Sequence, residues 1–192
     1  MREPYLLASA SPRRLEICRL AGIPVEVRPA LHEPPLDPAL PPADAVLALA
    51  RAKAEEVAAR FPGRIVIGAD TMVFAPVTIR PLGKPASAQA AADMLRLLQG
   101  RPHTVVTGVW VCSDSRSDGF AEEARVTFYP MTEDDIAAYV ATGEPMDKAG
   151  AYGIQGHGMR YIRGIEGDFY TVMGLPGARL WRFLQSFDET GR

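Results

Sequence analysis

The sequence predicts an α/β fold with a mixed sheet and flanking helices. Helical and strand-like segments alternate in the N-terminal half, two long β-type runs then follow each other as a hairpin, and an amphipathic helix comes last. The length of 192 residues and the 47% apolar content are those of a folded globule. We therefore expect one domain over residues 1–192.

Strands are predicted where apolar residues alternate with polar ones or form a short continuous run. The run Arg64–Ala69 is almost wholly apolar, as in a strand buried on both faces, and Asp70 follows at its carboxyl end. The polar stretch Ser113–Gly119 separates two long β-type runs, which predicts an antiparallel hairpin. The predicted strands are 5–8, 24–28, 64–69, 71–75, 103–112, 120–129 and 159–165.

Helices are predicted from capping residues and stop signals. Ser11 supplies an N-cap hydroxyl before a proline, Ser87 supplies another, and Thr132 with Asp135 forms a capping pair. Glycines and prolines end these helices and mark the loops between elements. The predicted helices are 12–21, 44–60, 88–99, 133–142 and 175–187, and the predicted irregular loops are the proline-rich 29–42 and the glycine-rich 143–158.

Composition excludes several classes of protein. Lys and Arg number 21 and Asp and Glu 23, for a net charge of −2, so no charge excess indicates a nucleic acid or an anionic membrane as partner. No apolar run approaches the ~20 residues of a membrane span, and the N-terminus lacks the apolar core of a secretory signal. Cys18 and Cys112 are too few for a disulfide framework or a zinc cluster, which predicts buried free thiols in a cytoplasmic protein.

Two places in the sequence carry residues suited to phosphate chemistry. The loop Ser9–Arg14 has two hydroxyls and two arginines at a helix N-terminus, which favours anion binding, although ordinary capping with surface arginines explains the same pattern. Asp70, at the tip of a buried strand, is a candidate to hold Mg²⁺ or to act as a general base. A turn cap is the structural alternative for Asp70.

Four further residues are weaker candidates. Glu33, in the proline-rich loop, offers a second carboxylate, and Lys53 lies among charged helix residues in a pattern typical of a solvated face. Lys84 stands on a stiff turn between glycine and proline, and the planar amide of Gln155 could pair with the edge of a base. These residues together predict metal-assisted phosphoryl chemistry.

The motifs identify a family when they are taken in order along the chain. The sequence resembles the Maf family of nucleoside triphosphate pyrophosphatases, the Maf-like proteins. The matching segments are LLASASPRRLEICRLAGIPVEV (6–27), ARAKAEEVA (50–58), IGADTMV (67–73), GKP (83–85), AADMLRLLQGRPHTVVTGV (91–109), DKAGAYGIQG (147–156) and GDFYTVMGLP (167–176).

The resemblance implies a fold and an activity. The fold would be elongated and two-lobed, related to inosine triphosphate pyrophosphatases, with the nucleotide in a central cleft. The activity would be hydrolysis between the α- and β-phosphates with Mg²⁺ or Mn²⁺, in a homodimer. Asp70 would be the general base, and Glu33 would help Asp70 to hold the metal. The residues lining the triphosphate would be Ser9, Ser11, Arg14, Lys53 and Lys84.

At three motif positions the chain resembles the branch of the family that acts on dTTP and UTP. The residues at these positions are Arg13, Thr71 and Gln155. Modified pyrimidine triphosphates would be related substrates. The branch linked to 7-methyl-GTP usually has glutamine after the aspartate. This chain departs from the family pattern at His32-Glu33, where the loop motif usually reads Asp-Glu.

Three alternatives stand beside this interpretation. One is a non-enzymatic regulator of septum formation, the role for which the family is named, and another is a pyrophosphatase that prefers 7-methyl-GTP. The combination of one carboxylate with several cations favours an enzyme over a binding protein. A nucleic-acid binder is disfavoured by the net charge of −2.

Overall fold

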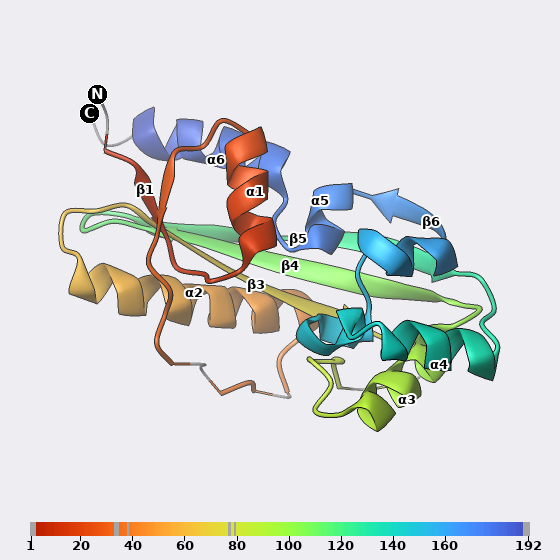
Figure 1. Ribbon diagram of the computed structural model, residues 1–192. Coiled ribbons are helices and arrows are strands. Elements are labelled where there is room, and N and C mark those ends of the chain that lie inside the picture. Colours follow the sequence, from red (N-terminus) through yellow and green to blue (C-terminus); the bar gives the residue numbers. More distant parts are fainter. Residues whose placement is uncertain (1–2, 33–34, 38, 77, 79, 190–192) are drawn as a thin grey trace. The chain divides into compact units, whose positions relative to one another are not determined.

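The computed structural model describes residues 3–32, 35–37, 39–76, 78 and 80–189. Over these residues it confirms the α/β class, with one mixed six-stranded sheet in the order β2-β1-β3-β4-β5-β6 (Figure 1). Strand β1 is parallel to β2 and β3, whereas β5 and β6 are antiparallel. The strands are β1 (Tyr5–Leu7), β2 (Val25–Val27), β3 (Val66–Phe74), β4 (Pro102–Cys112), β5 (Ser117–Phe128) and β6 (Ile162–Gly167).

Helices precede or follow most of these strands, and each predicted helix is present. The α-helices are α1 (Pro12–Leu20), α2 (Pro42–Arg60), α3 (Ala88–Leu98), α4 (Glu133–Ala141), α5 (Phe169–Met173) and α6 (Gly177–Glu189). Three 3₁₀ turns are η1 (Glu144–Asp147), η2 (Ala149–Ala151) and η3 (Gly156–Tyr161).

The chain divides into two compact units. Unit 1 comprises Met1–Asp70, Thr107–Glu122 and Met173–Arg192, and unit 2 comprises Thr71–Val106 and Glu123–Val172. Strands β3, β4 and β5 each contain the point at which the chain passes from one unit to the other.

The predicted caps are confirmed. The Ser11 side chain accepts the N–H of Arg14 at the start of α1, and Ser87 does the same for α3. Thr132 and Asp135 form a complete capping box at α4. Helix α2 begins at Pro42, two residues before the predicted start, because a proline in the first turn has no N–H that needs a partner.

The prediction of two strands around Asp70 was wrong. Residues Val66–Phe74 form one continuous strand, because the residues after Asp70 favour β structure and include no turn former. Strand β1 ends at Leu7, opposite Ile67. Asp70 therefore lies within β3, three residues past the end of its neighbour β1.

The C-terminal part of the sheet also differs from the prediction. Residues 156–161 form η3, so β6 begins at Ile162 and not at Met159. Helix α5 was not predicted. The hairpin turn between β4 and β5 is shorter than expected, because the Ser113 N–H donates to the Arg116 carbonyl at 2.8 Å and the strand resumes at Ser117.

Helix α2 packs against β3 and β4 at a distance that leaves no space for a side chain at two positions. An ideal Cβ at Gly68 would lie 2.2 Å from the Ala50 carbonyl oxygen, and one at Gly108 would lie 2.6 Å from backbone atoms of Val46. Figure 1 shows α2 running alongside these strands. Small residues on the inner face of the helix, including the fully buried Ala54, permit the close approach.

Both cysteines are free and buried, as predicted. Burial raises the pKa of the Cys18 thiol to about 12 and, with a smaller contribution from Glu55, that of Cys112 to about 11. Neither thiol is therefore a nucleophile at neutral pH. Among the described residues, no helix combines the length and the apolar content that a bilayer span requires.

His103 is buried in an aromatic cluster of unit 2. Its Nε2 lies 2.8 Å from the Tyr152 hydroxyl, and its ring makes edge contacts with Phe128 and Tyr152 at centroid distances of 5.1 and 5.2 Å. Burial lowers the pKa of His103 from 6.5 to about 4. The imidazole is therefore neutral in the folded protein at neutral pH.

We expect Gly68→Ala to destabilise the protein by ~1–3 kcal/mol or more, because the clashing atom is a backbone oxygen that cannot rotate away. Urea unfolding measures the change. Gly164→Ala on β6 is the matched control, because its Cβ would meet nothing within 4 Å. Equal stabilities of the two variants would contradict the close packing of α2.

We expect His103 to reduce stability as the pH falls from about 6.5 to about 4. In that range the imidazole of the unfolded chain binds a proton that the folded protein does not bind. The contribution of neutral His103 to the free energy of unfolding is therefore complete above pH 6.5, and up to about 3 kcal/mol of it is lost as the pH falls to about 4. Unfolding free energies of wild type and His103→Gln between pH 7.5 and 4 measure this effect. Parallel curves for the two proteins would refute it.

Candidate active site

The loop after β1 is organised around the hydroxyl of Ser9. The buried Ser9 Oγ accepts the backbone N–H of Ser11 at 3.3 Å and Nη1 of Arg14 at 3.0 Å. Arg14 Nε in turn donates to the Gly174 carbonyl at 2.8 Å. The capping interpretation is thus confirmed for Ser11, while the Arg14 guanidinium is held in place by two contacts and is not a loose surface arginine.

Lys53 and Asp70 form a largely buried ion pair within unit 1. Lys53 Nζ lies 2.7 Å from Asp70 Oδ1, and the side chains are 12% and 11% exposed. The solvated-face interpretation of Lys53 is therefore wrong. Helix α2 presents Lys53 next to Ala54, and Gly68 lies two residues before Asp70 on the same face of β3. The close approach at Gly68 is what brings the two charges together.

The Ser9 loop and Asp70 both lie beyond the carboxyl end of β1, which is parallel to β3. Strands β1 and β3 are parallel with Leu7 opposite Ile67, and the Ala8 N–H donates to the Ile67 carbonyl at 2.8 Å. The loop after Ala8 follows β1 directly, and Asp70 lies within β3, three residues past the carboxyl end of β1. Ligands of α/β proteins bind at this edge of the sheet.

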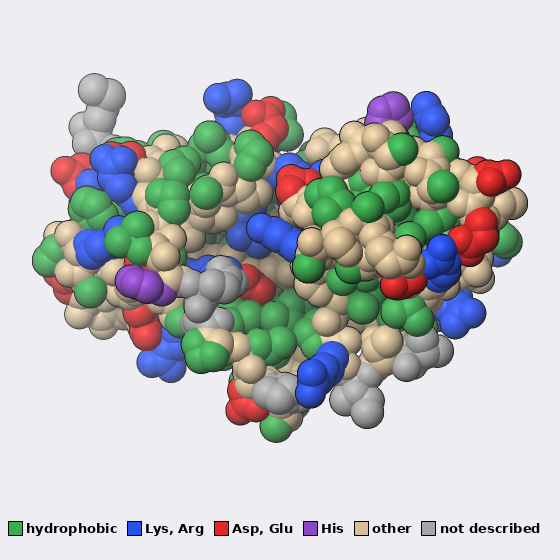
Figure 2. All heavy atoms as spheres, turned by 60° about the horizontal axis from the view of Figure 1, so that its bottom comes forward, with side chains coloured by type: hydrophobic (Ala, Val, Ile, Leu, Met, Phe, Trp, Pro, Cys, Tyr) green, Lys and Arg blue, Asp and Glu red, His purple; other side chains and the backbone are tan. Residues whose placement is uncertain are grey.

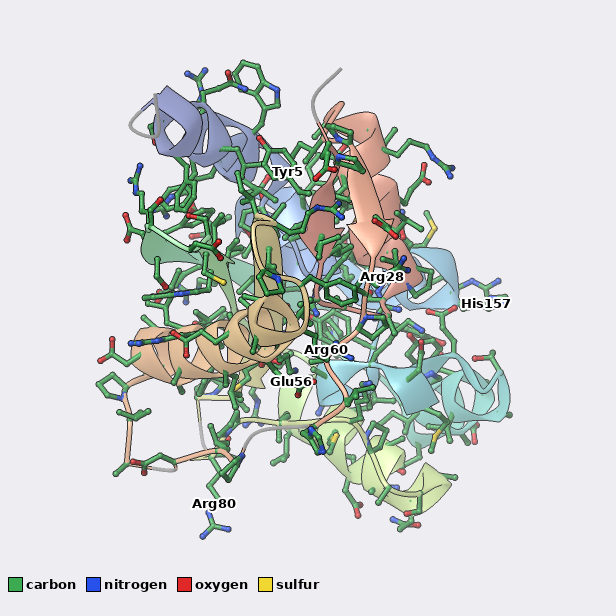
Figure 3. The ribbon with its side chains drawn as sticks, turned by 90° about the vertical axis from the view of Figure 1, so that its left-hand side faces the viewer. Tyr5, Arg28, Glu56, Arg60, Arg80 and His157 are labelled. Carbon is green, nitrogen blue, oxygen red and sulfur yellow. The ribbon has the colours of Figure 1, made fainter. Side chains whose placement is uncertain are left out.

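The segment after β2 is tied to helix α2 by Glu56. Its carboxylate accepts the backbone N–H groups of Leu31 at 2.7 Å and of His32 at 3.1 Å, and Arg60 donates to the Pro29 carbonyl at 2.7 Å. Figure 3 labels Glu56 and Arg60 on this helix. These hydrogen bonds lower the pKa of Glu56, led by the one from Leu31. The next residue, Glu33, lies outside the described residues.

Unit 2 holds Lys84 on a turn whose backbone is fixed on both sides. The Leu82 N–H donates to the Val73 carbonyl at 2.7 Å, and the Gly150 N–H donates to the Gly83 carbonyl at 3.1 Å. Gly150 has a φ of +69°, and a Cβ there would touch Val73 at 3.0 Å. The Lys84 side chain is exposed, so a turn held by backbone hydrogen bonds carries an ammonium group that is open to solvent.

The three residues expected to set substrate preference lie in different settings. Arg13 is half-buried in the first turn of α1 in unit 1, Thr71 is half-buried on β3 in unit 2, and Gln155 is exposed where η3 begins. The structure therefore joins Ser9 to Arg14 and Lys53 to Asp70 by hydrogen bonds. It places Lys84 and Gln155 in the other unit from these four.

The described residues contain no group of three or more His, Cys, Asp or Glu side chains placed to hold a metal ion. Of the two carboxylates expected to hold a metal, the structure describes that of Asp70. Mg²⁺ in proteins uses one or two carboxylates and completes its octahedron with water and substrate phosphates. Figure 2 shows both basic and acidic side chains on the visible face.

Sequence reasoning missed the residues that hold the loops. Glu56, Glu144 and the Gly174 carbonyl fix candidate segments through hydrogen bonds to distant parts of the chain. An acidic residue next to a glycine-rich segment is a weak sequence signal for such a contact. Gly68 carried no signal at all, because its neighbour is a helix backbone far away in sequence.

Comparison with known proteins places the chain in a family. The model of the family described as Maf-like protein matches residues 4–187. The chain is 48% identical over 185 residues to a protein of Bacillus cytotoxicus named dTTP/UTP pyrophosphatase, covering 96% of each chain. It is 46% identical over 188 residues to one of the same name from Bacillus velezensis, covering 98% of each.

Among solved structures, the Staphylococcus aureus Ham1 protein matches with a TM-score of 0.51 at 15% identity, covering 96% of this chain and 99% of that one. This likeness concerns the fold alone. The near-complete match to the family model and the identities of 46–48% carry the assignment. The chain belongs to the family of Maf-like proteins.

Proposed function

We propose that this protein is a nucleoside triphosphate pyrophosphatase that hydrolyses dTTP and UTP, or modified pyrimidine triphosphates, to the monophosphate and pyrophosphate. The observation that carries the proposal is the identity of 46–48%, over nearly the whole chain, with relatives named dTTP/UTP pyrophosphatase. Arg13, Thr71 and Gln155 support the preference for pyrimidines, because all three match the branch of the family that acts on dTTP and UTP.

Asp70 is the proposed general base. It accepts the proton of the water that attacks the phosphoanhydride between the α- and β-phosphates, and pyrophosphate leaves when that P–O bond breaks. The hydrogen bond from Lys53 at 2.7 Å orients the carboxylate.

Cationic groups and hydroxyls would hold the triphosphate. Arg14 lies beside the N-terminus of α1, where Ser9 and Ser11 add hydroxyl groups, and Lys84 adds a charge from its fixed turn. A helix N-terminus attracts phosphate oxygens through its free N–H groups. The chain as a whole has a net charge of −2 and does not attract an anion. These local groups are therefore the main electrostatic attraction for a triphosphate.

A divalent cation, Mg²⁺ or Mn²⁺, would be held by Asp70 and Glu33 together with phosphate oxygens. When bound, it would neutralise charge that develops on the phosphates. The Glu56 hydrogen bonds to Leu31 and His32 would hold the chain just before Glu33 close to helix α2.

Gln155 is the proposed reader of the base. Uracil and thymine present two carbonyl acceptors beside one N3–H donor. A single amide can donate an N–H to one carbonyl and accept the N3–H, so Gln155 matches this edge at two points. A site that pairs with polar edges rejects the wrong base, because its own groups then lack partners.

The other candidate functions differ from this one in a measurable way. A non-enzymatic regulator of septum formation would release no pyrophosphate from any triphosphate, and a 7-methyl-GTP pyrophosphatase would prefer that substrate to dTTP and UTP. A panel of triphosphates with Mg²⁺ or Mn²⁺, scored for monophosphate and pyrophosphate, separates all three. The cytoplasmic location and the homodimer stay predictions.

We expect Asp70→Asn to lower kcat by about 10²–10⁴, because the amide keeps the shape of the carboxylate and cannot accept the proton of water. Binding of dTTP should persist. Asp114→Asn is the matched control, because this exposed carboxylate also accepts hydrogen bonds, from the Gly63 N–H at 3.0 and 3.2 Å. Near-normal turnover by Asp70→Asn would remove Asp70 from the mechanism.

We expect Gln155→Ala to reduce the preference for dTTP and UTP over GTP and ATP by about tenfold or more, since the two hydrogen bonds to the base edge are lost. The ratio of kcat/KM values across the four triphosphates measures this. Gln89→Ala on α3, an exposed glutamine whose amide binds Asp93 at 3.0 Å, is the control and should keep the ratio. An unchanged ranking in Gln155→Ala would contradict the role in base recognition.

A further inference from the structure

Glu144, at the start of η1, binds both the helix before it and the loop that carries Gln155. Its carboxylate accepts the Tyr139 hydroxyl at 2.8 Å, the His157 N–H at 2.7 Å and the Gly158 N–H at 3.1 Å. All of these groups belong to unit 2. The His157 ring itself is exposed and points away from the protein (Figure 3), so Glu144 holds the backbone of this residue and not its side chain.

Tyr139 closes the other end of the same loop. Its hydroxyl oxygen accepts the Gly153 N–H at 3.1 Å while it donates to Glu144. The loop Gly153–Gly158 is therefore held at its first residue by Tyr139 and at its last two by Glu144. Gln155 lies between these two attachments.

The glycines of the loop allow this close contact. A Cβ at Gly158 would lie 2.2 Å from the Gly153 carbonyl oxygen and 2.6 Å from the Tyr139 hydroxyl. Gly156 has a φ of +76°, and a Cβ there would lie 2.5 Å from Glu144. The loop thus folds tightly over the carboxylate and the hydroxyl, which leaves its backbone little freedom.

The carboxylate of Glu144 is ionised at neutral pH. Partial burial acts to raise its pKa, but hydrogen bonds from His157, Tyr139 and Gly158 and the nearby charge of Lys148 lower it overall. Lys148 Nζ also donates to the Glu144 carbonyl oxygen at 2.7 Å. Hydrogen bonds to a charged acceptor are about twice as strong as neutral ones.

We propose that Glu144, through Tyr139 and the backbone of Gly153–Gly158, is a positioning residue for base recognition that fixes the backbone position from which the Gln155 amide reaches uracil or thymine. The inference rests on the proposed function. Gln155 is exposed, so the backbone of the loop fixes the position from which its side chain starts. A loop that is already ordered before binding loses less entropy when the base pairs with it, and it cannot readjust to suit a purine.

Glu144→Gln is the first test, because the amide keeps the size of the side chain but removes its charge and one acceptor. We expect the ratio of kcat/KM for dTTP to that for GTP to fall by about tenfold, mainly through a higher KM for dTTP, since Asp70 is unchanged. Glu133→Gln is the matched control. It breaks an ion pair with Arg96 at 2.6 Å on the same unit and should keep the ratio.

A double-variant comparison separates positioning from a general structural effect. In a Gln155→Ala background the amide is absent, so Glu144→Gln should change the dTTP to GTP ratio by less than about twofold. Tyr139→Phe keeps the buried ring and removes only the hydroxyl, so it tests the same attachment if Glu144→Gln does not fold.

Amide hydrogen exchange supplies a readout that is independent of activity. We expect the N–H groups of His157 and Gly158 to exchange at least about tenfold faster in Glu144→Gln than in the wild type. If the wild type does not hydrolyse dTTP or UTP, the proposed function fails. If the wild type does so, but Glu144→Gln keeps either its exchange protection or its substrate ranking, the positioning role alone is overturned.

Discussion

Helix α2 approaches β3 and β4 so closely that a Cβ at Gly68 would lie 2.2 Å from a backbone oxygen of the helix. Most of the unit 1 site depends on this contact. It sets the depth at which Lys53 meets Asp70, and the two side chains are only 12% and 11% exposed. The C-terminal part of the same helix carries Glu56, which accepts the N–H groups of Leu31 and His32 just before Glu33. One packing distance therefore controls two proposed parts of the catalytic machinery.

Carboxylates that accept backbone N–H groups hold loops in both units. Glu56 binds the N–H groups of Leu31 and His32, and Glu144 binds those of His157 and Gly158. Loops lack the regular hydrogen bonds of helices and strands, so their amides need other acceptors. An ionised carboxylate makes strong hydrogen bonds to these amides. It thereby holds the loop backbone and makes no use of the side chain of the candidate functional residue.

The proposed chemistry and the proposed specificity are distributed differently over the chain. The buried Lys53–Asp70 pair and the Ser9–Arg14 loop belong to unit 1, whereas Lys84 and Gln155 are carried by fixed segments of unit 2. Asp70 and Thr71 are consecutive residues of β3 and stand on either side of the division. The proposed general base and a residue proposed to set base preference are thus neighbours in sequence on one strand.

The sequence alone determined the features that depend on neighbours along the chain. The caps at Ser11, Ser87 and Thr132 were predicted and confirmed, because a cap needs only the side chain and the next turn of helix. The α/β class followed from the order of helical and strand-like segments, and the family followed from the order of motifs. The Lys53–Asp70 contact, the continuous β3 and the Glu144 attachment were decided only by the tertiary structure. Each of these depends on packing or on groups brought together by the fold, and no local pattern records such a distance.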